Sequence, residues 1–162
     1  MAEPADHTEL INSHLGGYNR AIGLSFVRAT ADEVVAELTV GPAHTQPYGL
    51  VHGGVYSGMI ETLCSTGAAI WAGAHGLTTV GLENTTSFLR ATRSGKLRGR
   101  GVPLARGQRT QVWEVQIHDE RERLVASGRV RLVNRPPGAH AAGEAVALEP
   151  EPAGPAGAKP AG

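Results

Sequence analysis

The chain has 162 residues, the length of one ordinary domain. Its fifteen Lys and Arg residues balance its fifteen Asp and Glu residues, which argues against bulk attraction to nucleic acid or to a membrane. The single cysteine, Cys64, excludes an intrachain disulfide and suits a reducing cytosol. Residues 1–6 show no signal-peptide pattern, and no apolar run approaches the ~20 residues of a membrane span. We therefore expect a cytoplasmic protein.

The N-terminal segment, residues 1–21, is expected to contain one short helix. The residues His7–Leu15 suit a helix, with Asp6 as its N-cap and Gly16 and Gly17 at its end. The main domain is expected to follow at residues 22–134.

The segment from Gln46 to Trp71 begins as a loop and continues as the longest expected helix. Pro47 and Gly49 interrupt regular structure, whereas no proline occurs from Gly54 to Trp71. Apolar residues appear on nearly every side of this helix, which predicts that it is buried all round. Glu61 is the single acid in its middle, and a buried carboxylate is costly unless it is paired or used in chemistry.

Helical spacing places small, partly polar residues on the face that carries Glu61. Ser57 and Ser65 lie four residues before and after it. Such a face leaves room for a substrate or a partner. The alternative is a close helix–helix contact in which a hydroxyl satisfies Glu61, with Ser65 as a hydroxyl that packs against another helix. Cys64 lies inside the apolar helix, which favours a packing role over a nucleophilic one.

Hydrogen-bond donors converge where this helix begins. The side chains of Gln46 and His52 and the backbone N–H of Gly53 lie near the helix N-terminus, where the dipole favours developing negative charge. Gly53 and Glu61 are separated by roughly 12 Å along one helix. A two-fold dimer with antiparallel helices would place Gly53 of one subunit beside Glu61 of the other, which predicts a site shared across the interface. A structural loop histidine is the alternative for His52.

The remaining pattern predicts six strands and a C-terminal tail. The expected strands are Ile22–Ala29, Glu33–Val40, Leu77–Leu89, Lys96–Val102, Gln108–His118 and Leu124–Val133. The order of two strands, one helix and four strands predicts an α+β fold, with an antiparallel sheet against one long helix. Residues 135–162 are expected to be disordered, because twenty of the 27 residues from Pro136 to Gly162 are Ala, Gly or Pro.

The run Gln46-Pro-Tyr-Gly-Leu-Val-His-Gly-Gly, followed by Glu61 and Ser65, resembles the signature of the hotdog-fold acyl-CoA thioesterases that carry their acid on the central helix. This subgroup includes 1,4-dihydroxy-2-naphthoyl-CoA hydrolases, 4-hydroxybenzoyl-CoA thioesterases and phenylacetate-pathway thioesterases. The resemblance extends from about Ile22 to Val133. It implies a curved sheet wrapped around one helix, hydrolysis of an acyl-CoA without metal or other cofactor, and homodimers with shared sites that pair into tetramers.

The resemblance also assigns roles to residues. Glu61 would act as general base or as nucleophile, and the sequence leaves both routes open. Gly53 N–H would polarise the thioester carbonyl, Gln46 and His52 would hold the thioester or the attacking water, and Ser65 would position the water or the acid. The residues that resemble coenzyme A contacts are Gly81, Phe88, Leu89, Arg90, Ala91, Ala105, Arg106, Gly107, Gln108, Arg109 and Thr110. The arginines in this set, Arg90, Arg106 and Arg109, offer positive charge to the phosphates. The alternative for these arginines is a basic face exposed to solvent.

The acyl group is the least constrained part of this interpretation. The stretch from Val80 through Trp113 to Glu120 is similar to the dihydroxynaphthoyl-CoA hydrolases, which favours an aromatic acyl group. A hotdog protein that binds acyl-CoA without hydrolysing it, or a hotdog hydratase or dehydratase, remains an alternative. Glu61 together with Gln46, His52 and Gly53 favours hydrolysis.

Overall fold

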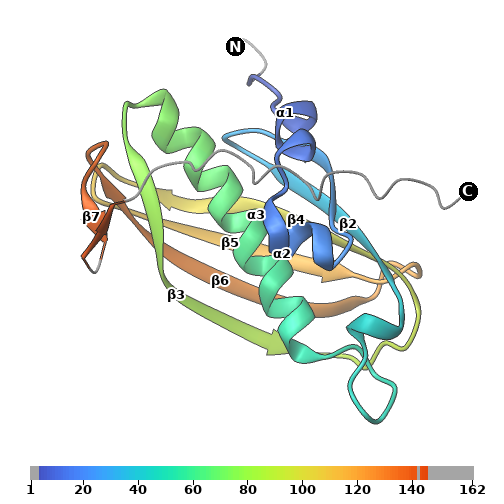
Figure 1. Cartoon of the computed structure of the whole chain (residues 1–162). Coiled ribbons are helices and arrows are strands. Elements are labelled where there is room, and N and C mark those ends of the chain that lie inside the picture. The colour runs from blue at the N-terminus through green and yellow to red at the C-terminus, as the bar shows by residue number, and fades with distance from the viewer. Residues whose placement is uncertain (1–3, 142, 146–162) are drawn as a thin grey trace, which may run out of the picture.

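One long helix, α3, lies across a six-stranded sheet that curves around it (Figure 1). The structure is a computed structural model that describes residues 4–141 and 143–145. Its helices are α1 (Thr8–Ser13), α2 (Gly16–Ala21), the 3₁₀ helix η1 (Pro42–His44) and α3 (Gly53–Ala74). Its strands are β1 (Ser25–Ala29), β2 (Val34–Val40), β3 (Thr78–Phe88), β4 (Gly95–Arg106), β5 (Thr110–His118), β6 (Leu124–Arg135), β7 (His140–Ala141) and β8 (Glu144–Ala145).

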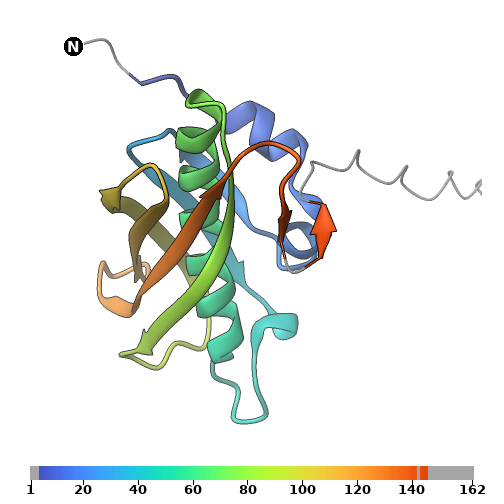
Figure 2. The same cartoon turned by 90° about the vertical axis from the view of Figure 1, so that its left-hand side faces the viewer.

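The sheet is antiparallel throughout, with the strand order β1-β2-β4-β5-β6-β3. The predicted α+β arrangement of two strands, one helix and four strands is therefore confirmed. Strand β3 lies at one edge of this sheet, where β6 is its only partner among the described strands, and it runs alongside α3 (Figure 2). This position matters below, because an edge strand leaves one row of backbone groups unpaired.

Close packing between α3 and the sheet depends on residues without bulk at the contact. A Cβ added at Gly67 of α3 would lie 2.4 Å from the ring of Trp113, so the indole fits only against a glycine. Leu63 packs in the same way over Gly99, where an added Cβ would lie 3.0 Å from its methyl group. Leu63 and Trp113 are fully buried, and truncating such side chains typically costs about 2–5 kcal/mol.

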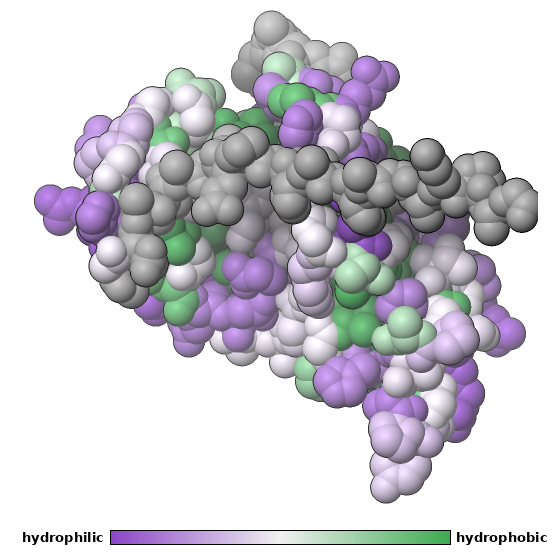
Figure 3. Space-filling view, in the orientation of Figure 1, coloured by the Kyte–Doolittle hydropathy of each residue, from purple (hydrophilic) through white to green (hydrophobic). Residues whose placement is uncertain are grey.

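The expectation that α3 is buried all round is wrong for the single chain. The sheet-facing side is buried, but Glu61 and Ser65 are half-buried and Ala69 is exposed. The reason is that the sheet curves around one side of the helix and leaves the Glu61 face partly open. In the part of Figure 3 that grey atoms do not cover, green apolar side chains lie among purple polar ones.

Two expectations at the chain ends also need correction. Gly16 and Gly17 begin a second helix, α2, because Gly16 adopts φ +69°, which turns the chain between two short helices. Asp6 accepts a hydrogen bond from Thr8 N–H at 2.9 Å, but the N-cap position is occupied by His7. The tail expectation does not hold for β7 and β8, which pair as a small hairpin. Residues 142 and 146–162 of that prediction lie outside the described residues.

Strand β4 is longer than expected. It runs to Arg106, so the expected turn from Ala105 to Thr110 narrows to the three residues Gly107–Arg109. A bulge between Pro103 and Ala105 explains the difference, because it lets the strand continue past a proline that cannot donate to the ladder. Among the described residues, no helix has the length and apolar character needed to cross a membrane.

Candidate active site along the long helix

The carboxylate of Glu61 is held at both oxygens. Ser65 Oγ donates to Oε1 at 3.0 Å, as the spacing of four residues along the helix predicts. The amide Nδ2 of Asn84, on strand β3, donates to Oε2 at 2.9 Å and to the carbonyl of Ser57 at 3.2 Å. The acid is therefore fixed between one residue of its own helix and one residue of the edge strand.

Strand β3 is shaped to receive this carboxylate. A Cβ at Gly81 would lie 2.8 Å from Glu61 Oε1, so glycine leaves the space that the acid occupies. A β-bulge follows between Gly81 and Glu83 and re-aims the strand before Asn84. Thr86 Oγ1 donates to Asn84 Oδ1 at 2.8 Å, which orients the amide with its Nδ2 toward Glu61.

Both partners of Glu61 are neutral. Within the described part of the chain, no basic side chain forms an ion pair with it. Ser65 and Asn84 each contribute one donor, and an ionised carboxylate has about four acceptor positions. Glu61 thus keeps acceptor capacity on a half-buried face, which suits a base or a nucleophile.

The start of α3 provides donors. His52 is the N-cap in an extended conformation, and its Nδ1 accepts from Gly54 N–H at 2.9 Å. With Nδ1 as the acceptor, a neutral His52 ring carries its proton on Nε2. The structural alternative for this histidine therefore has support, and it leaves an exposed Nε2–H donor. No described residue accepts a hydrogen bond from Gly53 N–H.

The loop before α3 orients Gln46. Its backbone N–H donates to Leu50 O at 2.8 Å, and Gly49 N–H donates to Gln46 O at 2.7 Å, with Gly49 at φ +71°. The side-chain Oε1 of Gln46 accepts from Tyr48 N–H at 2.7 Å. Because Oε1 is engaged within the loop, the Nε2 group is the end of the amide that is available to donate to a ligand.

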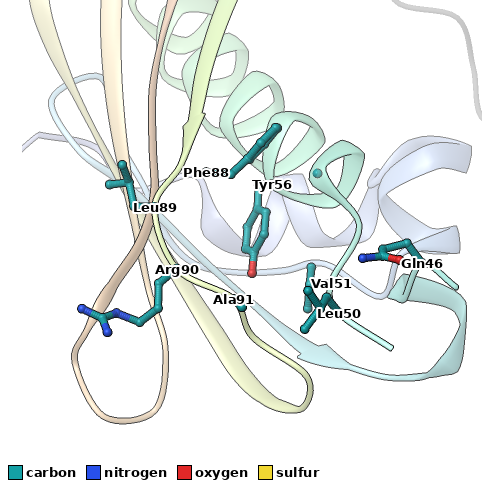
Figure 4. A pocket seen from close by; sticks show the side chains of 9 residues that line it. Gln46, Leu50, Val51, Tyr56, Phe88, Leu89, Arg90 and Ala91 are labelled. Carbon is teal, nitrogen blue, oxygen red and sulfur yellow. The ribbon is translucent and has the colours of Figure 1, made fainter. Parts of the chain in front are cut away.

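A pocket of about 320 Å³ opens beside these donors (Figure 4). Tyr56 and Phe88 form its aromatic wall, with ring centroids 6.1 Å apart and planes tilted by 36°. The full lining is Gln46, Leu50, Val51, Gly53, Tyr56, Phe88, Leu89, Arg90 and Ala91. The structure thus brings together two of the predicted catalytic residues and the predicted coenzyme A segment Phe88–Ala91.

The sequence did not predict that Tyr56 lines a pocket, because a tyrosine in an apolar helix has the same pattern whether it lines a pocket or packs in the core. Its side chain is 3 % exposed, and burial raises the pKa of its hydroxyl above the ordinary range. The hydroxyls of Tyr56 and Thr92 have no hydrogen-bond partner among the described residues. Tyr56 therefore stays neutral at working pH.

Two predicted groups lie away from this pocket on the same chain. Glu61 and Ser65 do not line it, and Glu61 lies eight residues, or roughly 12 Å, along the helix from Gly53. The turn Gly107–Arg109 lies toward the other end of α3, where Gln111 beside it donates to Ala68 O at 3.1 Å. A single chain therefore does not place Glu61, Gly53 and the whole of the predicted coenzyme A contacts at one point.

Comparison with known proteins decides the family. The family model described as the thioesterase superfamily matches residues 48–126. A Mycobacterium tuberculosis protein named as an esterase, Rv1847, is 43% identical over 119 residues, which cover 72% of this chain and 85% of the relative. Its structure superposes with a TM-score of 0.72 at 42% identity, over 74% of this chain and 96% of that one.

The chain belongs to the thioesterase superfamily. Two further relatives agree. The proofreading thioesterase EntH of Klebsiella pneumoniae is 34% identical over 109 residues, 67% of this chain and 79% of the relative. The crystal structure of thioesterase HI1161 from Haemophilus influenzae has a TM-score of 0.74 at 29% identity, over 80% of this chain and 90% of that one. The chain is thus a thioester hydrolase with the hotdog fold, as the sequence resemblance implied.

The cysteine of this thioesterase is not its nucleophile. Cys64 is fully buried. Burial, with the charge of nearby Glu61 as a smaller contribution, raises the pKa of its thiol far above the ordinary range. A thiol that stays protonated does not attack a thioester, so the packing role expected from sequence is supported.

The predicted phosphate contacts of the thioesterase differ in availability. Arg106 is already engaged, because its Nη1 donates to Ala31 O and to Asp32 Oδ1, both at 2.7 Å. Arg109 is exposed and has no partner among the described residues, and Arg90 lies at the pocket with its guanidinium pointing outward (Figure 4). Arg90 and Arg109 are therefore better placed than Arg106 to meet a phosphate.

Proposed function

We propose that this thioesterase hydrolyses an acyl-CoA in a site shared by two copies of the chain. The observation that carries the proposal is the division of chemical groups along α3. Glu61, with spare acceptor capacity, lies mid-helix, whereas Gly53 N–H and the Gln46 amide face a pocket at the helix start. One small thioester group does not reach both on one chain, since roughly 12 Å separates them.

In the proposed reaction, the carbonyl oxygen of the thioester accepts from Gly53 N–H, supported by the dipole of α3. Glu61 of the second copy either takes a proton from a water that attacks the carbonyl carbon, or attacks that carbon itself to form an anhydride that water then cleaves. In both routes the C–S bond breaks, the sulfur leaves as coenzyme A thiolate and takes up a proton, and the acyl group leaves as a free acid. Gln46 and His52 hold the thioester or the water, and Ser65 positions Glu61.

The edge strand supports the proposed dimer. Strand β3 pairs with β6 on one side only, and its apolar residues Leu82 and Phe88 are 54% and 59% exposed. A long edge strand with exposed apolar residues is a surface that proteins normally cover. A two-fold axis there would set two α3 helices antiparallel and bring Gly53 of each toward Glu61 of the other. Two such dimers would form the tetramer expected from the resemblance.

The pocket supports an aromatic acyl-CoA as substrate. The ring of Phe88, which is 59% exposed, offers stacking surface beside the proposed oxyanion donor, and Tyr56 lies next to it in the pocket wall. The group best matched by the sequence resemblance is 1,4-dihydroxy-2-naphthoyl. Coenzyme A would run along Gly81, Phe88–Ala91 and the segment Ala105–Thr110, with Arg90 and Arg109 near its phosphates. The chemistry needs no metal or other cofactor.

Two further predictions, the domain limits and the location in the cell, depend on the sequence alone. The domain limits, 22–134 for the thioesterase domain with 1–21 before it and 135–162 after it, remain a prediction. A cytoplasmic location also remains one, since it rests on the single cysteine.

The test is a panel of aromatic and aliphatic acyl-CoA thioesters, assayed for release of free thiol by the wild-type protein. We expect turnover of aromatic thioesters, with a higher kcat/KM than for aliphatic thioesters of similar size. Equal rates for both classes would refute the aromatic assignment. Binding without release of thiol, from folded protein, would instead indicate an acyl-CoA-binding protein.

A further inference from the structure

A buried pair of polar side chains links α3 to the turn Gly107–Arg109. Gln111 Nε2 donates to Ala68 O of the helix at 3.1 Å and to Asn134 Oδ1 at 2.8 Å. Asn134 Nδ2 then donates to Gly107 O at 2.8 Å and to Gln108 O at 3.4 Å. We call Gln111 and Asn134 the relay, because each hydrogen-bonds to the next part of the structure.

The relay has no spare hydrogen-bonding group directed elsewhere. Gln111 is completely buried, and its Oε1 accepts from Trp113 Nε1 at 3.0 Å. Asn134 is 7% exposed, and its backbone N–H donates to Arg109 O at 2.9 Å. A buried polar network in which each member is satisfied fixes one geometry, because loss of one member leaves the others unpaired in a buried site.

What the relay fixes is the carbonyl side of an exposed turn. The three carbonyls of Gly107, Gln108 and Arg109 all accept from Asn134, so they point inward. The backbone N–H groups of Gln108 and Arg109 have no acceptor among the described residues. The Arg109 side chain, also without a described partner, adds a positive charge at the same turn. Adjacent free N–H groups with a cation are a suitable arrangement for a phosphate.

We propose that Gln111 and Asn134 are positioning residues that hold the Gly107–Arg109 turn in the shape that binds the phosphates of coenzyme A. This inference rests on the proposed function, because it takes that turn as a phosphate contact. The relay also fixes the turn relative to α3, since Ala68 lies seven residues, or roughly 10 Å, along the helix from Glu61. The phosphate end of the substrate is thereby held at a set distance from the acid.

The test separates phosphate binding from fold stability with two substrates that share one acyl group. One is the aromatic acyl-CoA, and the other is the same acyl group on N-acetylcysteamine, which lacks all phosphates. Asn134→Leu should raise KM for the acyl-CoA by about tenfold, the effect of losing roughly 1.4 kcal/mol of hydrogen bonding. Its kcat for acyl-CoA and its kcat/KM for the short thioester should stay within about twofold of wild type.

The matched control is Asn12→Leu. The side-chain amide of Asn12 also makes two hydrogen bonds to backbone, since it donates to Phe26 O and accepts from Phe26 N–H, both at 2.9 Å. These bonds anchor α1 to β1 and not to the turn. The Asn12→Leu variant should have a lower melting temperature, but the ratio of its KM for the acyl-CoA to its KM for the short thioester should match that of the wild type. Gln111→Met removes the hydrogen bonds to Ala68 O, to Trp113 and to Asn134 Oδ1, but it leaves the side chain that binds the turn in place. It provides a second variant if Asn134→Leu does not fold, and should shift the ratio in the same direction.

Equal changes for both substrates, or no change for either, in the folded variants would overturn the proposal. Failure of the proposed function is distinguishable, because coenzyme A alone can be titrated calorimetrically without any turnover. If the wild type hydrolyses nothing but Asn134→Leu weakens coenzyme A binding about tenfold relative to wild type and Asn12→Leu, the relay assignment stands and the hydrolase assignment falls. No binding of coenzyme A by the wild type would refute the relay.

Discussion

The start and the middle of α3 differ in what they offer to a reaction. The start, from His52 to Tyr56, presents donors and a pocket but no acid. The middle, around Glu61, presents an acid between Ser65 and Asn84 but lies outside that pocket. Each region therefore lacks a group that the proposed reaction needs, and the other region carries that group. Two antiparallel copies would complete both.

The largest expected effect is at the middle of the helix. Glu61→Gln removes the base or nucleophile while keeping the shape of the side chain, so kcat should fall by about 10²-fold or more. The melting temperature should change little, because the described partners of Glu61 are the half-buried Ser65 and the exposed Asn84, both neutral. The matched control is Glu83→Gln, an exposed acid on β3 that pairs with Arg131 at 3.5 Å. Wild-type kcat in Glu61→Gln would show that the middle of the helix is not catalytic.

A smaller effect should come from the residue that orients this acid. Asn84→Ala removes the donor to Glu61 Oε2 and leaves the carboxylate in place, so kcat should fall by about tenfold. Steady-state kinetics measures this, with Thr85→Ala, the exposed neighbour on the same strand, as the control. A drop in Thr85→Ala as large as that in Asn84→Ala would indicate damage to β3 rather than loss of positioning.

The two partners of Glu61, Ser65 and Asn84, show what the sequence could and could not predict. Ser65 was found because four residues along a helix always share a face. Asn84 was not found, because it reaches Glu61 from a strand 23 residues later, through a bulge that no local pattern predicts. The order of strands and helix followed from periodicity, whereas the start of α2 at Gly16 depends on a positive φ between two short helices.

The predicted coenzyme A segment shows a second limit of sequence reasoning. Arg106 and Arg109 look equivalent in sequence, since they lie one and two residues from the same glycine, Gly107. Only the folded chain shows that Arg106 pairs with Asp32, which comes from the turn between β1 and β2 and is 74 residues away. Ion pairs between distant segments depend on the sheet register, so a list of nearby arginines overestimates the free charge.

Substitution of Cys64, the cysteine of the helix, is expected to leave activity unchanged. Cys64 should resist iodoacetamide in the native state, because it is fully buried and the pKa of its thiol is raised by that burial. Mass spectrometry of native and unfolded protein should show alkylation only after unfolding, and Cys64→Ala should keep wild-type kcat. Rapid native alkylation with parallel loss of activity would contradict the packing role.

A small effect on stability, rather than on activity, should appear at Asp119. Its carboxylate hydrogen-bonds to an arginine, whereas the partners of Glu61 are neutral. Hydrogen bonds from Arg123 lower the pKa of Asp119 to about 2. Because the folded pKa is lower than the ordinary value, the stabilisation is complete above about pH 4 and is lost as the pH falls toward 2. The urea midpoint of the wild type should therefore fall over that range more steeply than that of Asp119→Asn. Parallel pH profiles for the two proteins would contradict this role.

The most direct measurement of the shared site combines the two regions of α3. Glu61→Gln disables the middle, and Gly53→Pro disables the start by removing its N–H and placing atoms against Phe88. Proline suits this position, since His52 is extended and Gly53 is the first helical residue. Each variant must first be shown to be a folded dimer that exchanges subunits.

Each variant alone should be inactive. In a mixed dimer, a shared site places both lesions in one pocket and neither in the other, so random 1:1 mixing should restore up to about one quarter of wild-type activity. If each site lay within one chain, every pocket would keep one lesion. A mixture that stays inactive despite proven subunit exchange would then contradict the shared site.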